Sequence, residues 1–192
     1  MDRERLQNET RCDQGFHMRL SDFTAIADAC RESGEGFAAF QRADRVLGLH
    51  WPAEVVEQWL YDHSDKGPFL RDYGDVDLLQ IRWDLEALRA VDIAAMPTGP
   101  SDHEVIDEVA ANPEHWISVR SSGAHIGVAQ MWELHGTWKR WPVLIDRSLL
   151  APPDAGLQVV EGWTRVGILK GRLNQDAFVA ERHLAWVGRP GA

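Results

Sequence analysis

Cysteine is almost absent from this sequence of 192 residues. The only two, Cys12 and Cys30, lack the close Cys or His partners that metal-binding patterns show. A disulfide framework needs more cysteines than this, and a structural zinc site needs four ligands. We therefore expect two free thiols, no disulfide and no metal site.

Long hydrophobic runs are also lacking. Residues 1–12 are polar and charged, unlike the apolar stretch of a signal peptide, and no later segment stays apolar for the length of a membrane span. Hydrophobic residues still make up 44% of the sequence and charged residues 26%, which is typical of folded proteins. We expect a folded cytoplasmic protein with no membrane partner.

Positive charge is in deficit, because 20 Lys and Arg stand against 30 Asp and Glu, a net charge of −10. Residues 111–192 hold nine basic and seven acidic residues, a net charge of +2, so residues 1–110 carry −12. This balance argues against a broad basic surface for nucleic acid. The acidic part has two interpretations: charge that keeps the protein soluble, which is the commoner reason, or a surface that covers a basic partner protein.

Residues 1–112 show the patterns of a mainly helical part. Pro52 suits the first turn of a helix whose apolar face repeats at helical spacing through Trp59 and ends near His63. A second set of apolar residues, three or four positions apart, predicts another helix: Leu78, Ile81, Leu85 and Leu88. We expect an acidic, mainly helical N-terminal subdomain over residues 1–112.

Residues 113–192 show short strands around one helix. Strands are predicted at 143–145, 157–160 and 183–187, and a further short strand at 116–120. A helix is predicted from about Thr164 to Asn174 by its apolar face. The segment 127–134 fits a strand or a helix, with His135-Gly136 as its end. The predicted fold class is therefore α/β (α+β), with the sheet after the helical part.

The junction between the strand at 157–160 and the helix reads Glu161-Gly162-Trp163-Thr164-Arg165. The N–H groups of a helix start have no partner within the helix, and the helix dipole favours an anion there. Gly162 lets the backbone approach a ligand, Thr164 offers a hydroxyl, and Arg165 offers a planar fork suited to phosphate. The junction predicts a phosphate-binding turn, although Gly before a helix is also common in ordinary turns.

The run from Leu157 to Arg172 resembles the acid-Gly-x-x-Arg signature of the ParB N-terminal and sulfiredoxin superfamily, in which a strand leads into a helix whose start binds nucleotide phosphates. The segment from Trp141 to Asp146 is similar to that family's earlier, proline-led strand. The resemblance covers roughly residues 135–188. It implies a small ParB/sulfiredoxin-like mixed sheet with helices, and a phosphate-binding α/β subdomain over residues 113–192.

The resemblance also implies a ligand and residue roles. A nucleotide, ATP or CTP, with Mg²⁺ as an option, would bind at four residues: Gly162, Trp163, Thr164 and Arg165. The catalytic residues would be Glu161, as acid or base, and Arg165. Thr164 departs from the family, where His or Arg is common, and Trp163 replaces the catalytic Cys of sulfiredoxin, which argues against sulfinic-acid reductase chemistry.

The implied function is NTP hydrolysis or phosphoryl transfer, or nuclease activity as described for small Osa-type fertility-inhibition proteins, in a bacterial cell or on a mobile element. The alternative is a non-enzymatic inhibitor or immunity protein that binds a basic partner through the acidic helical part. The partners left open are therefore a nucleotide, DNA and a basic protein.

Aromatic and histidine residues near the turn have alternative interpretations. Trp132, Trp138 and Trp141 could form a stacking surface for a base, although tryptophans more often belong to a core or an interface. His135 and His183 could act as a general base, although a surface or core-edge histidine is the commoner case.

Overall fold

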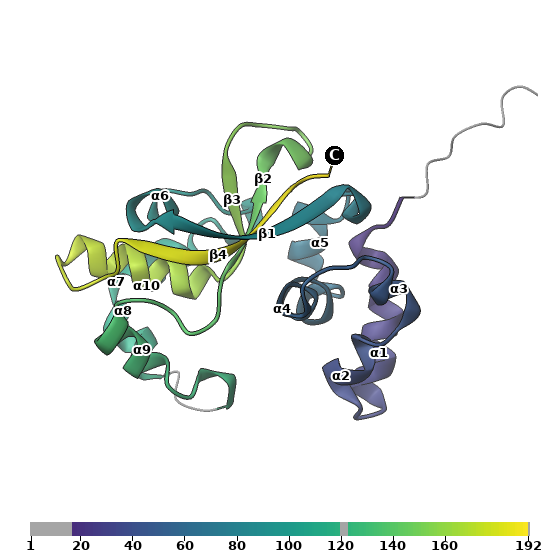
Figure 1. Cartoon of the computed structure of the whole chain (residues 1–192), viewed down its shortest axis with the longest axis horizontal. Coiled ribbons are helices and arrows are strands. Elements are labelled where there is room, and N and C mark those ends of the chain that lie inside the picture. Colours follow the sequence, from purple (N-terminus) through teal and green to yellow (C-terminus); the bar gives the residue numbers. More distant parts are fainter. Residues whose placement is uncertain (1–16, 120–122, 192) are drawn as a thin grey trace, which may run out of the picture.

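A four-stranded sheet lies in the middle of the computed structural model, which describes residues 17–119 and 123–191 (Figure 1). The strand order is β1-β4-β2-β3, with β4 and β2 parallel and the other two pairs antiparallel. The strands are β1 (Ile81–Arg89), β2 (Val143–Asp146), β3 (Leu157–Glu161) and β4 (Arg182–Pro190). The predicted α/β class is confirmed as a mixed, open sheet with helices.

Ten α-helices accompany this sheet within the described residues. They are α1 (Thr24–Glu32), α2 (Gly36–Phe40), α3 (Asp44–Leu47), α4 (Ala53–Val55), α5 (Gly67–Tyr73), α6 (Ala90–Ala94), α7 (Val105–Ala111), α8 (Pro113–Ser118), α9 (Val128–His135) and α10 (Trp163–Asn174). A π-helical segment, η2 (Val56–Tyr61), continues α4, so the helix predicted after Pro52 is present. None of the helices in the described part is long and apolar enough to cross a membrane.

The central strands face two different hydrophobic cores. On β2, Val143 and Ile145 pack in the core that holds residues of α1 to α5, whereas Leu144 packs in the core that holds residues of α6 to α10. On β3, Val160 and Val159 divide in the same way. Successive side chains of a strand point to opposite faces of the sheet. One group of helices therefore packs against each face.

Strand β1 corrects the helix predicted from Leu78 to Leu88. The nine residues of β1 pair with β4 in continuous register, beginning with Ile81 opposite Pro190. Apolar residues four positions apart, such as Ile81 and Leu85, share a face in a helix and also in a strand, so their spacing did not separate the two. This pairing joins a strand of the predicted N-terminal subdomain, residues 1–112, to a strand of the predicted C-terminal subdomain, residues 113–192. The division into these two subdomains stays a prediction.

The sequence pattern of the C-terminal part is largely confirmed. The predicted strands at 143–145, 157–160 and 183–187 are β2, β3 and β4, and the predicted helix is α10. The segment that fitted a strand or a helix forms α9, which ends at the left-handed residue Gly136. In these elements, the spacing of apolar residues and the position of glycine predicted the same secondary structure that the folded chain has.

The strand predicted at 116–120 is wrong, because residues 113–118 form α8. Pro113 occupies the first turn of that helix, and the side chain of Asn112 accepts a hydrogen bond from the backbone N–H of His115 at 3.4 Å. Both are helix-start signals that outweigh the β-branched and aromatic residues that follow. Arg120, at the end of the predicted strand, lies outside the described residues.

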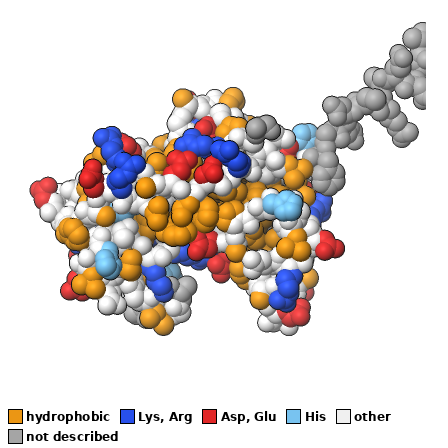
Figure 2. Space-filling view, in the orientation of Figure 1, with side chains coloured by type: hydrophobic (Ala, Val, Ile, Leu, Met, Phe, Trp, Pro, Cys, Tyr) orange, Lys and Arg blue, Asp and Glu red, His pale blue; other side chains and the backbone are white. Residues whose placement is uncertain are grey.

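Hydrophobic side chains reach the surface on the β1–β4 pair. Leu85 lies opposite Trp186, and Leu85 and Leu184 are 38% and 39% exposed. Figure 2 shows hydrophobic side chains gathered in the middle of this view, between the two groups of helices. Elsewhere, Cys30 is a free thiol as expected, and Cys12 lies outside the described residues.

Candidate functional site

The predicted turn is present as a left-handed glycine between β3 and α10. Gly162 has a φ of 102° and forms the N-terminal cap of α10. A Cβ at this position would lie 2.6 Å from the Cβ of Pro142. Only glycine satisfies both the backbone conformation and this close approach, so the protein's own packing already requires Gly162.

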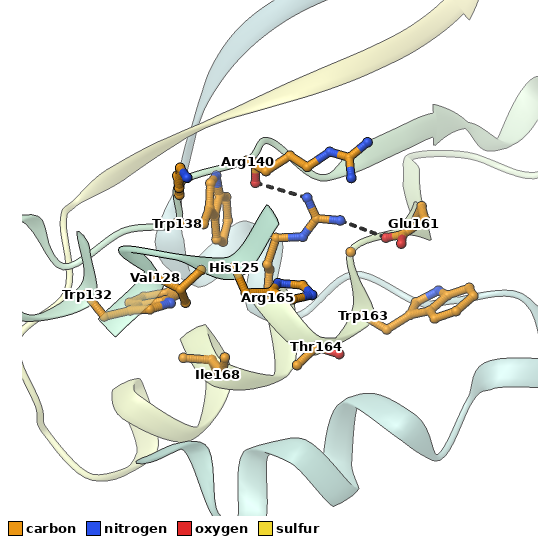
Figure 3. A pocket seen from close by; sticks show the side chains of 12 residues that line it. His125, Val128, Trp132, Trp138, Arg140, Glu161, Trp163, Thr164, Arg165 and Ile168 are labelled. Atoms are coloured by element: carbon orange, nitrogen blue, oxygen red, sulfur yellow. Dashed lines mark hydrogen bonds and ion pairs between the residues drawn. The ribbon is translucent and has the colours of Figure 1, made fainter. Parts of the chain in front are cut away.

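Arg165 is held by acceptors from three segments of the protein, and Figure 3 shows two of them, Glu161 and the backbone of Arg140. Its guanidinium donates to Oε2 of Glu161 at 2.8 Å and to Oε1 of Gln58 at 2.7 Å. It also donates to the backbone carbonyl oxygens of Arg140 and Trp141, at 3.0 and 3.2 Å. Arg165 therefore ties α10 to β3, to η2 and to the loop that precedes β2.

Glu161 is the charged partner in this network. Its Oε2 accepts from Arg165, and its Oε1 lies 3.9 Å from Nε2 of His63. Burial alone would raise the pKa of Glu161, but Arg165 and His63 outweigh burial and hold the pKa below its ordinary value. A general base works best with a pKa near the working pH, so this setting favours a permanently ionised carboxylate. The acid or base role of Glu161 stays a prediction.

A cavity of about 140 Å³ opens beside this network. A cavity near 150 Å³ can hold a benzene ring, so the space suits a single ring or a phosphate group. Val128, Trp132, Trp138 and Ile168 line one part of it, and Lys139 and Arg140 bring positive charge to its wall. The cavity thus combines an apolar end with basic groups near the start of α10 (Figure 3).

The structure brings the five predicted site residues together at this cavity. Its lining includes Glu161, Gly162, Trp163, Thr164 and Arg165. The indole of Trp163, however, extends away from the cavity (Figure 3), with its ring centroid 5.8 Å from that of His63. The backbone at position 163, rather than its side chain, therefore faces the cavity.

Two of the three clustered tryptophans line the cavity. Trp132 and Trp138 are 1% and 3% exposed, with ring centroids 6.1 Å apart in an edge-to-face arrangement. Trp141 instead packs against Trp186, with centroids 5.7 Å apart. Trp132 and Trp138 are therefore core residues, as the commoner interpretation has it, and they also form a wall of the cavity, while stacking of a base on them stays a prediction.

Gly136 brings the loop after α9 back toward the sheet. Its φ is 60°, and a Cβ there would lie 2.7 Å from the backbone N of Ala180. The loop then places Trp138 so that its Nε1 donates to the carbonyl oxygen of Leu184 at 2.8 Å. The position of Trp138 is therefore fixed from both the loop and β4.

His183 is a buried core residue beneath these rings, and His135 is exposed. The Nδ1 of His183 lies 2.8 Å from Oγ1 of Thr137, and its ring centroid lies 4.5 Å from that of Trp138. Burial lowers the pKa of His183 to about 4, although a hydrogen bond with the backbone of Ala180 acts in the opposite direction. The ring is therefore neutral at pH 7, which agrees with the core interpretation.

Sequence reasoning missed four polar residues of this region. Gln58 and His63 belong to the N-terminal part and reach the turn only in the folded chain. Lys139 and Arg140 had a usable signal, since they are adjacent basic residues just before the proline-led strand. Arg140 donates a hydrogen bond to Glu57 of η2, which fixes its guanidinium.

The described part of the chain contains no group of three or more His, Cys, Asp or Glu side chains arranged to hold a metal ion. No protein-family model, curated protein or solved structure matches this chain.

Proposed function

We propose that the cavity beside α10 binds the phosphorylated end of a small molecule, with a nucleotide such as ATP or CTP as the leading candidate. The observation that carries this proposal is the meeting of basic groups with the start of α10 at one opening. A helix start favours an anion through its N–H groups and its dipole. The apolar end of the same cavity suits an apolar group next to the phosphate, and the rest of a nucleotide, which is larger than this cavity, would extend from its opening.

Lys139 is the basic group best placed to respond to an anion. Its Nζ donates to the carbonyl oxygen of Ile126 at 2.9 Å, and among the described residues it forms no ion pair. Arg140 and Arg165, by contrast, are already paired with Glu57 and Glu161. Lys139 is therefore expected to supply most of the uncompensated charge.

The proposal includes a relationship to the ParB and sulfiredoxin fold. It is supported by β3, the left-handed Gly162 and α10 in direct succession, with the acid at 161 and Arg165 on the first turn. The proline-led strand β2 also lies beside β3. This support is local to the turn and its two strands.

Binding is favoured over turnover by the contacts at this site. Arg165 and Glu161 hold each other, so neither is set aside for a transferring phosphoryl group. NTP hydrolysis, phosphoryl transfer and nuclease activity are therefore outcomes to be measured. Phosphate release from ATP and CTP, and cleavage of DNA, with and without Mg²⁺, would show whether binding leads to chemistry.

The binding test is a titration of the full chain with ATP, CTP and inorganic pyrophosphate, with and without Mg²⁺, followed by calorimetry and thermal unfolding. A ligand that binds the folded state raises the Tm as its concentration exceeds the Kd. Lys139→Ala is expected to weaken binding of all three ligands. Lys170→Ala is the matched control, because Lys170 lies on α10 but pairs with Asp107 away from the cavity.

If none of these ligands raises the Tm of the wild-type protein, the proposal is wrong. If they bind but Lys139→Ala behaves like the control, they bind elsewhere.

The inhibitor or immunity function remains an alternative proposal. Part of the acidic charge is paired within the N-terminal helices, since Arg31 pairs with Asp28 and Asp65. This pairing leaves less free charge for a basic partner than the sequence suggests. Capture of a basic protein that survives Lys139→Ala and weakens as salt rises would favour the alternative.

A further inference from the structure

The two edges of the sheet are not equally protected. At one edge, β3 has five residues, and the backbone N–H of Val159 donates to the carbonyl oxygen of Pro97, so part of that edge is already paired. At the other edge, β1 has nine residues and pairs with β4. Within the described part of the chain, no backbone group pairs with the outer side of β1. β1 therefore presents a row of unpaired backbone groups.

The pairing of β1 with β4 shows which backbone groups point outward. At its two ends, the N–H of Ala90 donates to the carbonyl oxygen of Glu181, and the N–H of Gly191 donates to that of Gln80. In an antiparallel pair, residues that bond to the neighbouring strand alternate with residues whose backbone groups point away. The even-numbered residues of β1 therefore bond to β4. The outward backbone groups are those of the odd-numbered residues: Ile81, Trp83, Leu85, Ala87 and Arg89.

This edge lacks most of the features that keep edge strands from pairing with other chains. Such features are proline, lysine, a bulge or a short length. β1 contains no proline or lysine, and its register against β4 is continuous over all nine residues. One outward group is occupied, since the carbonyl oxygen of Ala87 accepts a hydrogen bond from the guanidinium of Arg182. The open part of the edge therefore runs from Ile81 to Leu85.

The charges of this open part complement those of a second copy. In a two-fold antiparallel pairing centred on Trp83, Arg82 of each chain lies opposite Asp84 of the other. The side chains of Arg82 and Asp84 are 65% and 46% exposed, and they form an ion pair at 2.9 Å within the chain. The two copies together would therefore place four charges of alternating sign side by side.

This complementarity also selects one register. Since outward backbone groups must meet outward groups, the register can change only in steps of two residues. One such step places Asp84 opposite Asp84 of the other copy, and the step in the other direction places Arg82 opposite Arg82. Like charges directly opposite each other destabilise a strand pair. The register centred on Trp83 is therefore favoured over both of its neighbours.

We propose that β1 pairs with β1 of a second copy of this chain, antiparallel and centred on Trp83, so that two sheets join across a two-fold axis. The outward N–H and C=O groups of Ile81, Trp83 and Leu85 then all have partners. Leu85, which is 38% exposed, lies opposite Ile81 of the other copy. A second copy is favoured over a different protein because the same segment supplies both members of each ion pair. The residues of β1 do not line the cavity beside α10, so this interface is independent of the proposed function.

Sedimentation velocity of the full chain, at concentrations from about 1 to about 200 µM, tests the pairing. The mass of the wild type is expected to rise from 21.7 kDa towards twice that value. Arg82→Asp should weaken the dimer about tenfold, because two attractive cross-strand pairs become repulsive. The double variant Arg82→Asp, Asp84→Arg exchanges the two charges and should restore the wild-type dissociation constant.

Leu184→Lys is the matched control for Leu85→Lys. Leu184 is 39% exposed, much like Leu85, but it lies on β4 and not at the edge of the sheet. Leu85→Lys places a charge against Ile81 of the other copy and should weaken the dimer, whereas Leu184→Lys should dimerise as the wild type does.

Hydrogen exchange in the wild type gives a measurement for each residue. The backbone N–H groups of Trp83 and Leu85 should exchange rapidly in dilute solution and slowly at high concentration. The N–H groups of Asp84 and Glu86, which bond to β4, should exchange slowly at both concentrations.

If the wild type keeps the mass of a single chain at every concentration, the proposal is wrong. If it dimerises but Arg82→Asp has no effect, or if Leu184→Lys weakens the dimer as much as Leu85→Lys, the copies meet through another surface and the pairing of β1 is overturned. If the double variant stays as weak as Arg82→Asp, the pairing centred on Trp83 is wrong.

Discussion

The guanidinium of Arg165 lies 2.8 Å from the carboxylate of Glu161, and the two side chains are only 18% and 21% exposed. This pair joins the first turn of α10 to the last residue of β3. Through Gln58 the same guanidinium also reaches the N-terminal helices. Glu161 and Arg165, which the sequence predicted to belong to a phosphate site, thus also connect α10 and β3 to the N-terminal helices.

Arg165→Ala is expected to destabilise the protein by about 3 kcal/mol, because it leaves Glu161 buried without its partner. Urea unfolding measures the change in the free energy of unfolding. Arg165→Lys is the control, since it keeps the charge but loses the planar fork, and it should be less destabilised. Unfolding of Arg165→Ala at the wild-type urea concentration would show that the pair does not stabilise the fold.

Glu161 should make stability depend on acid pH. Its folded pKa is lowered, so its contribution is present above its ordinary pKa of 4.5 and is lost as the pH falls through the folded pKa. The difference in unfolding free energy between wild type and Glu161→Gln is therefore expected to be largest above pH 5 and to shrink below pH 4.5. Asp107→Asn, at an exposed pair with Lys170, is the control.

A difference between wild type and Glu161→Gln that stays constant from pH 7 to pH 3 would contradict this assignment. It would mean that Glu161 contributes through packing alone.

Gly162→Ala should be more destabilising than Gly156→Ala. Both glycines have positive φ, 102° and 88°, but an added Cβ meets Pro142 at position 162 and nothing within 4 Å at position 156. Backbone strain alone costs about 1–3 kcal/mol at each position, and the clash adds to it only at Gly162. Equal melting temperatures for the two variants would show that the Pro142 loop moves aside without cost.

His183 should make the protein less stable as the pH falls from 7 to 5. Burial lowers its folded pKa to about 4, so between 6.5 and 4 the unfolded chain binds a proton that the folded protein does not. Between pH 7 and pH 5, His183 alone is expected to lower the free energy of unfolding by about 2 kcal/mol.

The test is urea unfolding of His183→Gln at pH 7 and pH 5, since this variant should lose that part of the pH dependence. His135→Gln, on the exposed end of α9, should keep the wild-type profile. If the stability of His183→Gln depends on pH as that of the wild type does, another group causes the loss of stability between pH 7 and pH 5.

The turn and its strands were predictable because their signals are local. Val159 and Val160 form part of a short apolar run, and Gly162 follows at the point where a strand must give way to a helix. The helix start at Pro113 was also visible, but the aromatic and β-branched residues after it led to the wrong assignment. Local signals therefore predicted the right secondary structure only where all of them favoured the same element.

The sequence by itself determined a strand, a turn at a glycine and a helix at residues 157–174, because strand propensity, glycine's backbone freedom and helical spacing act between neighbours. Only the tertiary structure decided that residues 81–89 form a strand, since their spacing fits either element until β4 supplies its hydrogen bonds. It also decided what surrounds Arg165, because Gln58 lies 107 positions away in the chain. Contacts between residues so far apart in the sequence form only when both hydrophobic cores have packed on opposite faces of the sheet. The spacing of neighbouring residues does not predict them.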